Sequence, residues 1–93
     1  MDVKEAVNAA KHHVETLFGD QLFSAPMLEE IEFDSADKAW NITIGFLRMP
    51  ELALPGKGQG AHALGLALSV PRRAYKVVRI SDQAAAVMSV KDR

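Results

Sequence analysis

The stretch Ala39–Leu47, AWNITIGFL, decides the fold of this chain. Successive side chains of an extended strand point to opposite faces, so its large apolar residues share one face and its smaller residues share the other. The apolar face consists of Trp40, Ile42, Ile44 and Phe46. Such a face has to be covered, and two interpretations are open: it packs against a helix, or it lines a ligand pocket. We favour the helix.

The covering helix is predicted at residues 3–18. Apolar side chains recur there at steps of three and four residues, as on one stripe of an amphipathic helix. The stripe consists of Val3, Val7, Ala10, Val14 and Leu17, with Ala6 beside it and Phe18 at its end. Asp2 is placed to cap the first turn with Glu5 as its capping-box partner, and Gly19 occupies the position of a left-handed C-terminal cap.

Four strands complete the predicted fold. The first alternates acidic and apolar residues, and the others are rich in β-branched and aromatic residues. These strands span residues 28–34, 38–48, 73–81 and 85–91. Prolines and glycines break the pattern over residues 49–72, which we expect to be a long loop. The predicted class is α+β: one N-terminal helix packed on a four-stranded antiparallel meander, in a single domain spanning residues 1–93.

The other face of the sheet is predicted to be open and polar. Its residues are Glu30, Glu32 and Asp34 on the first strand, Asn41 and Thr43 on the second, and Lys76 on the third. Val77 and Val78 are adjacent and break the alternation, so we expect a bulge there or burial on both faces.

The net charge of −1 conceals an uneven distribution. Residues 1–60 carry five basic and ten acidic side chains, whereas residues 71–93 carry six basic and two acidic ones. Since the first and third strands of a meander lie toward opposite edges, we expect these charges to pair between molecules and not within one. The chain has no cysteine, no apolar run of signal-peptide length and no window long enough to span a membrane, so we expect a cytoplasmic protein that does not associate with membranes.

No catalytic, cofactor or metal site is predicted. The stretch Gly56–His62, GKGQGAH, lacks the Ser or Thr that follows Lys57 in a phosphate-binding loop. His12 and His13 are adjacent, so on a helix they point about 100° apart and cannot share one metal ion. The serines lack a Gly-x-Ser-x-Gly context, and strand carboxylates usually form the solvated side of a sheet. We therefore predict that the protein is not an enzyme.

Several segments together resemble the PepSY-like group of small α+β domains. They are the helix VKEAVNAAKHHV, the acidic strand, the W-x-I-x-I strand, and the closing YKVVRIS and AVMSVK strands. The final turn, SDQAAAV, departs from the group because it lacks a glycine. PepSY-like domains are mostly exported or membrane-attached and are associated with inhibiting or regulating peptidases, so the resemblance implies a regulatory or inhibitory role toward a protein.

Two sets of residues are candidate binding surfaces. A possible protein interface consists of Leu64, Leu66, Leu68, Val70, Arg72 and Arg73, and a possible ligand wall consists of Trp40, Phe46 and Tyr75. We expect a non-enzymatic protein-interaction module that forms a homodimer through residues 61–70 or an edge strand. The alternatives are a small-ligand domain between helix and sheet, or a nucleic-acid-binding accessory protein using the basic C-terminal strands.

Overall fold

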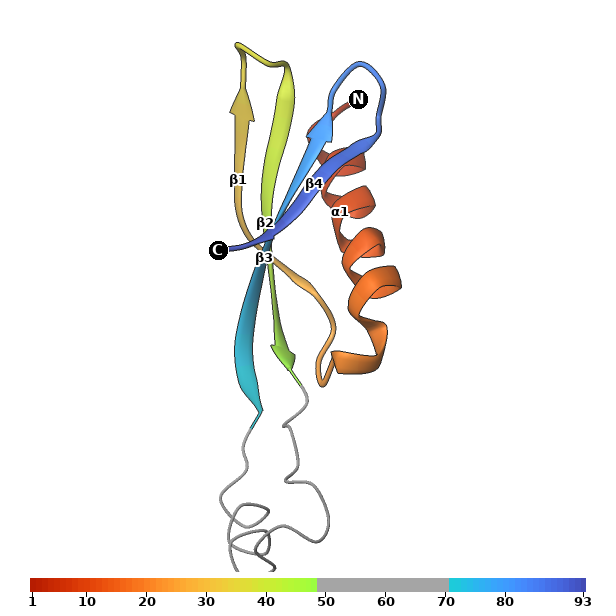
Figure 1. Cartoon of the computed structure of the whole chain (residues 1–93). Coiled ribbons are helices and arrows are strands. Elements are labelled where there is room, and N and C mark those ends of the chain that lie inside the picture. The colour runs from red at the N-terminus through yellow and green to blue at the C-terminus, as the bar shows by residue number, and fades with distance from the viewer. Residues whose placement is uncertain (49–70) are drawn as a thin grey trace, which may run out of the picture.

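The structure is a computed structural model and describes residues 1–48 and 71–93. Its elements are α1 (Val3–Phe18), the 3-10 helix η1 (Gly19–Gln21), β1 (Met27–Asp34), β2 (Ala39–Arg48), β3 (Arg72–Ser81) and β4 (Val87–Asp92). The strands form one antiparallel sheet in the order β1-β2-β3-β4, and α1 lies along one side of it (Figure 1). The predicted α+β class and meander order are confirmed. The helix has the predicted bounds, and each strand begins and ends within two residues of its predicted position.

The two ends of α1 differ in how well the sequence predicted them. The side chain of Asp2 accepts a hydrogen bond of 2.8 Å from the backbone N–H of Glu5, which confirms the N-terminal cap. Gly19, in contrast, has φ −55° and ψ −36°, a right-handed conformation. The predicted left-handed cap is therefore wrong, because the chain tightens directly into η1.

The buried row of α1 is narrower than the predicted stripe. Ala6, Ala10 and Val14 are fully buried, whereas Val3 and Leu17 are 49% and 50% exposed. Residues spaced by four lie one above the other on a helix, and the two alanines let the helix axis approach the sheet closely. The predicted stripe is thus wrong at both ends.

The core lies between α1 and the two central strands. The buried helix residues pack against Ile42, Ile44 and Phe46 of β2 and Val78 and Ile80 of β3. Phe18 closes the lower end by stacking on Phe46, with ring centroids 6.3 Å apart. Burial of each large apolar side chain stabilises the fold by about 1.5–3 kcal/mol. The apolar face of the AWNITIGFL stretch therefore meets a helix, as predicted.

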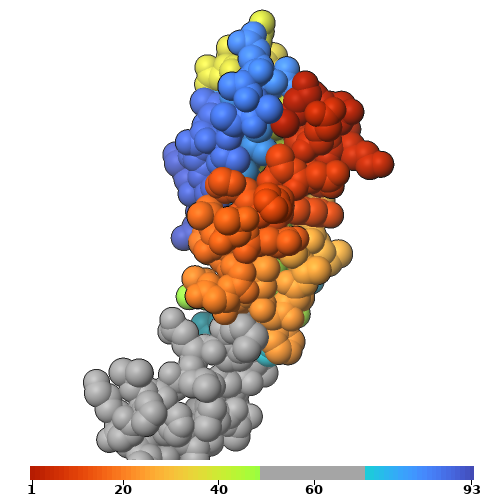
Figure 2. All heavy atoms as spheres, turned by 90° about the vertical axis from the view of Figure 1, so that its right-hand side faces the viewer, coloured from red at the N-terminus to blue at the C-terminus, as the bar shows by residue number. Residues whose placement is uncertain are grey.

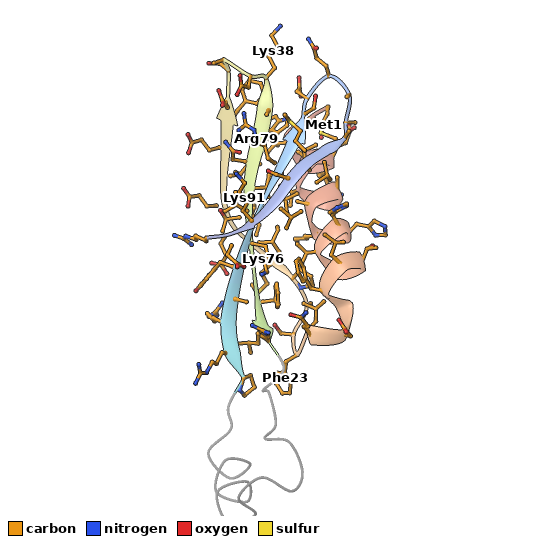
Figure 3. The ribbon with its side chains drawn as sticks, viewed as in Figure 1. Met1, Phe23, Lys38, Lys76, Arg79 and Lys91 are labelled. Atoms are coloured by element: carbon orange, nitrogen blue, oxygen red, sulfur yellow. The ribbon has the colours of Figure 1, made fainter. Side chains whose placement is uncertain are left out.

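Lys76 lies on the helix side of the sheet, and its predicted place on the open face is wrong. The ladder between β2 and β3 is unbroken, so Lys76 is opposite Ile44 and shares its face. Figure 3 labels Lys76 among the side chains of the sheet. Its Nζ lies 4.6 Å from the centre of the Phe18 ring and forms an ion pair with Asp92. The long aliphatic stem covers apolar surface while the ammonium reaches an anion and an aromatic ring.

The bulge predicted at Val77 and Val78 is absent, and the alternative, burial on both faces, is met in part. Val78 is buried in the core and Val77 is half-buried on the open face, both within a regular ladder to β2. The register shifts instead between β3 and β4, where Met88 is the extra residue of a β-bulge, and between β1 and β2 at Glu29. Each edge strand therefore carries one bulge.

Within residues 1–48 and 71–93, neither helix has the length and hydropathy needed to span a membrane.

Candidate functional site

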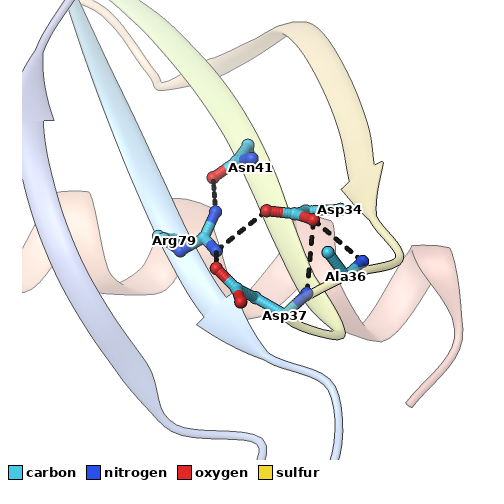
Figure 4. A network of polar contacts seen from close by, with 5 residues as sticks. All are labelled: Asp34, Ala36, Asp37, Asn41 and Arg79. Atoms are coloured by element: carbon cyan, nitrogen blue, oxygen red, sulfur yellow. Dashed lines mark hydrogen bonds and ion pairs between the residues drawn. The ribbon is translucent and has the colours of Figure 1, made fainter.

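Three arginines lie across the open face and connect the basic strands to the acidic strand β1. The most fully bonded of them is Arg79 of β3 (Figure 4). Its guanidinium donates to Asn41 Oδ1 at 2.9 Å, to Asp34 Oδ2 at 3.0 Å and to Asp37 Oδ2 at 2.7 Å. A planar guanidinium can serve several acceptors at once, so Arg79 ties β3 to β2 and to the β1–β2 turn.

Asp34 also organises the turn that follows β1. Its Oδ1 accepts the backbone N–H groups of Ala36 at 3.0 Å and Asp37 at 3.3 Å (Figure 4). Lys38 completes the turn with φ 49°. The side-chain hydrogen bond from Arg79 lowers the pKa of Asp34 below its ordinary value, and the backbone hydrogen bond from Asp37 adds to this effect. On the helix side, the hydrogen bond and charge of Lys76 likewise lower the pKa of Asp92.

The second arginine, Arg73, reaches β1 over a glycine. Its Nη1 lies 3.4 Å from Glu29 Oε1, although β2 separates the two strands. A Cβ at Gly45 would lie 2.6 Å from Glu29 Oε1 and 2.8 Å from Glu29 Cγ. Gly45 therefore leaves the space through which the Glu29 side chain crosses β2, which explains a glycine in the middle of a central strand.

The third arginine, Arg93, continues the β4 ladder and lies against Tyr75. Its backbone N–H donates to Tyr75 O, and its guanidinium carbon lies 5.2 Å from the centre of the Tyr75 ring. Its Nη2 lies 3.9 Å from Glu30 Oε2. The expectation that the acidic and basic strands cannot pair within one molecule is thus wrong. Strands β1 and β3 flank β2 at a separation of about 10 Å, a distance that an arginine spans.

The outer edge of β1 is exposed along nearly its whole length. Leu28 and Phe33 are on the helix side and remain 41% and 42% exposed. Glu30, Glu32 and Asp34 are on the open face, opposite Thr43, Asn41 and Ala39. Every open-face residue from position 30 to position 34 is therefore acidic. Among the residues that the structure describes, Glu32 forms no ion pair or hydrogen bond through its side chain.

Within the acidic row of β1, from Glu30 to Asp34, the backbone groups that face away from the sheet belong to Ile31 and Phe33. Phe23 N–H donates to Leu47 O at 2.7 Å, so the backbone of Leu47 faces the β1 side. Because backbone direction alternates along a strand, the Thr43 and Asn41 backbones face the same side. The backbone groups of their partners, Glu30 and Glu32, therefore bond to β2. The backbone groups of Ile31 and Phe33 point away from the sheet.

The outer edge of β4 differs from that of β1 in its side chains. The hydrogen bond from Arg93 N–H to Tyr75 O turns Arg93 inward, so the Val90 and Asp92 backbones point outward by the same alternation. The open-face residues are Ser89 and Lys91, and Lys91 forms no ion pair with the part of the chain described here (Figure 3). Figure 2 shows that α1 leaves β4 uncovered, and Met88 is 54% exposed.

The structure separates the residues of the predicted sites. Leu64, Leu66, Leu68 and Val70 lie outside the described residues. Arg72 and Arg73 are exposed at the start of β3, where Arg73 binds Glu29.

The predicted ligand wall is not one surface. Trp40 and Phe46 face α1, whereas Tyr75 is opposite Gly45 and faces the other way. The Trp40 ring lies 4.8 Å from Phe33 and its Nε1 donates to Asp82 Oδ1 at 3.0 Å, so this tryptophan is held by protein groups.

The histidines that the structure describes both lie on α1. His12 is exposed and His13 is half-buried on α1. In residues 1–48 and 71–93, no three His, Cys, Asp or Glu side chains gather in a way that could hold a metal ion. No family model, curated protein or solved structure matches this chain, so the resemblance to PepSY-like domains stays a prediction.

The cross-strand arginine bridges were not predicted from the sequence, although the sequence contains a signal for them. A glycine inside the AWNITIGFL strand marks a close approach of another group, and an alternating acidic strand needs cations within reach. Combining the two with the β1-β2-β3 order would have indicated Glu29 and Arg73. The Arg79 contacts depend on the β2–β3 register, which the sequence pattern does not specify.

Proposed function

We propose that this chain is a non-enzymatic protein-interaction domain that forms a homodimer by antiparallel pairing of two β4 strands. The observation that carries the proposal is a difference between the two edge strands. Pairing β1 with a second β1 places like charges opposite each other, whereas pairing β4 with a second β4 does not. In a continuous sheet, residues that face each other across the new ladder share a face, so the open-face side chains decide which pairings are favourable.

The β4 edge offers a self-pairing register without like charges opposite each other. With Val90 opposite Val90 of the second copy, Ser89 of each copy lies opposite Lys91 of the other. In the same register the outward backbone groups of Val90 can exchange two hydrogen bonds across the two-fold axis. Such an interface is closed, since each β4 edge is used once.

Exposed apolar side chains supply the hydrophobic part of this interface. Met88 is 54% exposed, and Val87 and Val90 are half-buried on the side of the sheet that carries α1. Dimerisation would place these side chains of both copies next to each other between two helices. Burial of apolar surface, more than ion pairing at the rim, provides the affinity of such contacts.

The alternatives have less support from the geometry. A small ligand between helix and sheet would have to displace core side chains such as Val14 of α1 and Phe46 of β2, which belong to one buried cluster. Nucleic acid would have to compete with carboxylates for Arg73, Arg79 and Arg93.

A regulatory or inhibitory role of the dimer toward another protein, as the PepSY resemblance implies, is compatible with the proposal. We keep the cytoplasm as its proposed compartment, because so small a domain without cysteine suits a reducing environment.

Sedimentation equilibrium of the wild type and of Val90→Pro tests the proposal. Proline removes an N–H that points away from the sheet, so it blocks strand addition without breaking a bond to β3. Val90→Thr keeps both the N–H and the shape and serves as the matched control. We expect dimers for the wild type and Val90→Thr and monomers for Val90→Pro, all with the same circular dichroism spectrum. A monomeric wild type, or dimers that persist in Val90→Pro, would contradict the proposal.

A further inference from the structure

The edge of β1 has backbone groups that no described residue bonds, but its side chains oppose pairing with a second β1. Its outward backbone groups, at Ile31 and Phe33, form the same kind of ladder template as those of β4. Because Glu30, Glu32 and Asp34 are all on the open face, every antiparallel register in which the outward groups of Ile31 and Phe33 bond to those of a second β1 sets carboxylate opposite carboxylate. Like charges directly opposite each other destabilise a strand pair, so a second β1 is excluded as the occupant.

The charges of β1 are only partly matched within the chain. Arg79 holds Asp34 and Arg73 holds Glu29, at the two ends of the strand. Between them, Glu30 meets Arg93 only at 3.9 Å with both side chains more than half exposed, and Glu32 has no partner among the described residues. The middle of the acidic row is therefore the part that can still accept cations.

The opposite face of β1 is apolar and also exposed. Leu28 and Phe33 are 41% and 42% exposed beside half-buried Ile31 and Trp40. An added strand would continue this apolar row on the helix side while its other face meets the carboxylates. A strand added at β1 must therefore carry basic residues on its open face and apolar residues on its helix side.

We infer that β1 is an acceptor edge for an extended segment of a partner protein in which basic and apolar residues alternate. The basic residues lie opposite Glu30 and Glu32, the apolar residues lie opposite Ile31 and Phe33, and the partner backbone bonds the outward groups of the latter two. This edge is opposite the proposed dimer edge, so a dimer presents two such sites, one at each end of its sheet.

A synthetic peptide tests the inference directly. The probe is the acetylated and amidated peptide TRVKVRT, titrated into isotope-labelled wild-type protein at physiological salt while backbone amide shifts are followed by NMR. The matched peptide TVVRKRT has the same composition without the alternation, and TEVEVET has the alternation with opposite charge. We expect TRVKVRT to shift the Ile31 and Phe33 amides at millimolar concentration and to bind at least several-fold more tightly than either control. Equal shifts with TVVRKRT would reduce the effect to general charge attraction and overturn the inference, as would the absence of shifts at β1.

Variants of β1 separate the backbone contribution from the charge contribution. Phe33→Pro removes one outward N–H and is expected to abolish binding, whereas Phe33→Ala keeps that N–H and should weaken it only a few-fold. Glu30→Lys combined with Glu32→Lys should lower the affinity for TRVKVRT by about ten-fold or more and favour TEVEVET instead, since each cross-strand ion pair contributes roughly two- to five-fold. An unchanged peptide preference in this double variant would contradict the proposed register.

The dimer variant shows which of the two proposals fails if one does. Monomeric Val90→Pro should bind TRVKVRT as the wild type does, because β1 and β4 lie at opposite edges. Loss of peptide binding in Val90→Pro together with an intact circular dichroism spectrum would contradict the proposal that the β1 site works independently of the β4 edge. A wild type that is monomeric and still binds TRVKVRT would overturn the dimer and leave the β1 site standing.

Discussion

Strands β1 and β4 occupy corresponding places at the two edges of one sheet, and each carries a β-bulge, yet their open-face side chains differ. On β1 these side chains are all carboxylates from position 30 to position 34, whereas β4 presents a serine next to a lysine. Both edges have backbone groups that are not bonded by any residue in 1–48 or 71–93. The comparison teaches that exposure alone does not define an interface, because the row of charges decides which strand can be added.

The two edges also differ in how the rest of the molecule supports them. Arginines that cross β2 reach β1 from the far side and offset the repulsion within its acidic row. On β4 the charged contact lies on the other side of the sheet, where Asp92 meets Lys76. The chain's own arginines thus hold the two ends of the acidic row on β1, whereas Ser89 and Lys91 on the open face of β4 meet no carboxylate of the described residues.

Reversing one charge should convert β1 from a strand that repels itself into one that pairs. In Glu32→Lys, the register centred on Ile31 places the introduced lysine of each copy opposite Glu30 of the other, so two repulsions become two attractions. In the Val90→Pro background, which blocks β4, we expect Glu32→Lys to form dimers that sedimentation equilibrium detects. Glu32→Gln in the same background removes the repulsion without adding an attraction and should remain monomeric. A monomeric Glu32→Lys variant would show that charge is not what distinguishes the edges.

Loss of the Arg79 bridge should weaken the β1 side of the sheet and spare the β4 side. Arg79→Met keeps most of the aliphatic stem but removes the donor to Asn41, Asp34 and Asp37. We expect the free energy of unfolding to fall by about 0.5–1.5 kcal/mol, mainly through the part-buried hydrogen bond to Asn41, because ion pairs to exposed carboxylates add little. Chemical denaturation measures the change, and amide exchange should accelerate around residues 34–41 more than in β4. Arg79→Lys keeps the charge without the planar fork and should fall between the two. Wild-type stability in Arg79→Met would mean that the network contributes nothing to the fold.

The crossing of Glu29 over Gly45 predicts a coupled pair of substitutions. Gly45→Ala should destabilise the protein by about 1 kcal/mol, because the new methyl group displaces the Glu29 side chain from its path to Arg73. In a Glu29→Ala background the same change should be neutral or stabilising, since alanine restricts the unfolded chain and meets no obstacle. Denaturation of the four proteins in a double-mutant cycle gives the coupling. Additive effects would contradict the crossing.

The smallest expected effect is in the acid branch of the stability curve, where the two edges should behave alike. The pKa values of Asp34 and Asp92 are lowered from 3.8 by Arg79 and Lys76 respectively. A carboxyl with a lowered pKa in the folded state contributes stability that is fully present above its ordinary pKa and is lost as the pH falls through the folded value. Asp34→Asn and Asp92→Asn should each flatten the loss of stability below the ordinary carboxyl pKa of 3.8, as thermal denaturation across pH measures. An unchanged acid branch in both variants would contradict these two contacts.

The architecture could be predicted from the sequence because it depends on patterns that neighbouring residues carry. The apolar alternation from Trp40 to Phe46, the helical spacing near the N-terminus and the acidic alternation between them each indicated their element. The exposed ends of the helix stripe were missed for a related reason. A step of four and a step of three look equivalent in sequence, but only the tertiary contact with β2 selects the row of Ala6, Ala10 and Val14.

The contacts of the open face could not be predicted in the same way, because they depend on register. A shift of one residue moves every side chain of a strand to the other face, which is how Lys76 came to be assigned to the wrong side. The arginine bridges require that β3 lie beside β2 in a particular register, and the charge asymmetry of the sequence does not contain that information. Once the register is known, the destination of Arg79 follows from its position opposite Asn41.

Amide hydrogen exchange measured at several protein concentrations compares the two edges in one experiment. If β4 pairs with itself and β1 does not, protection of the Val90 amide should rise with concentration while the Phe33 amide continues to exchange as an exposed group. Protection that rises at Phe33, or that stays constant at Val90 throughout the range, would contradict the account.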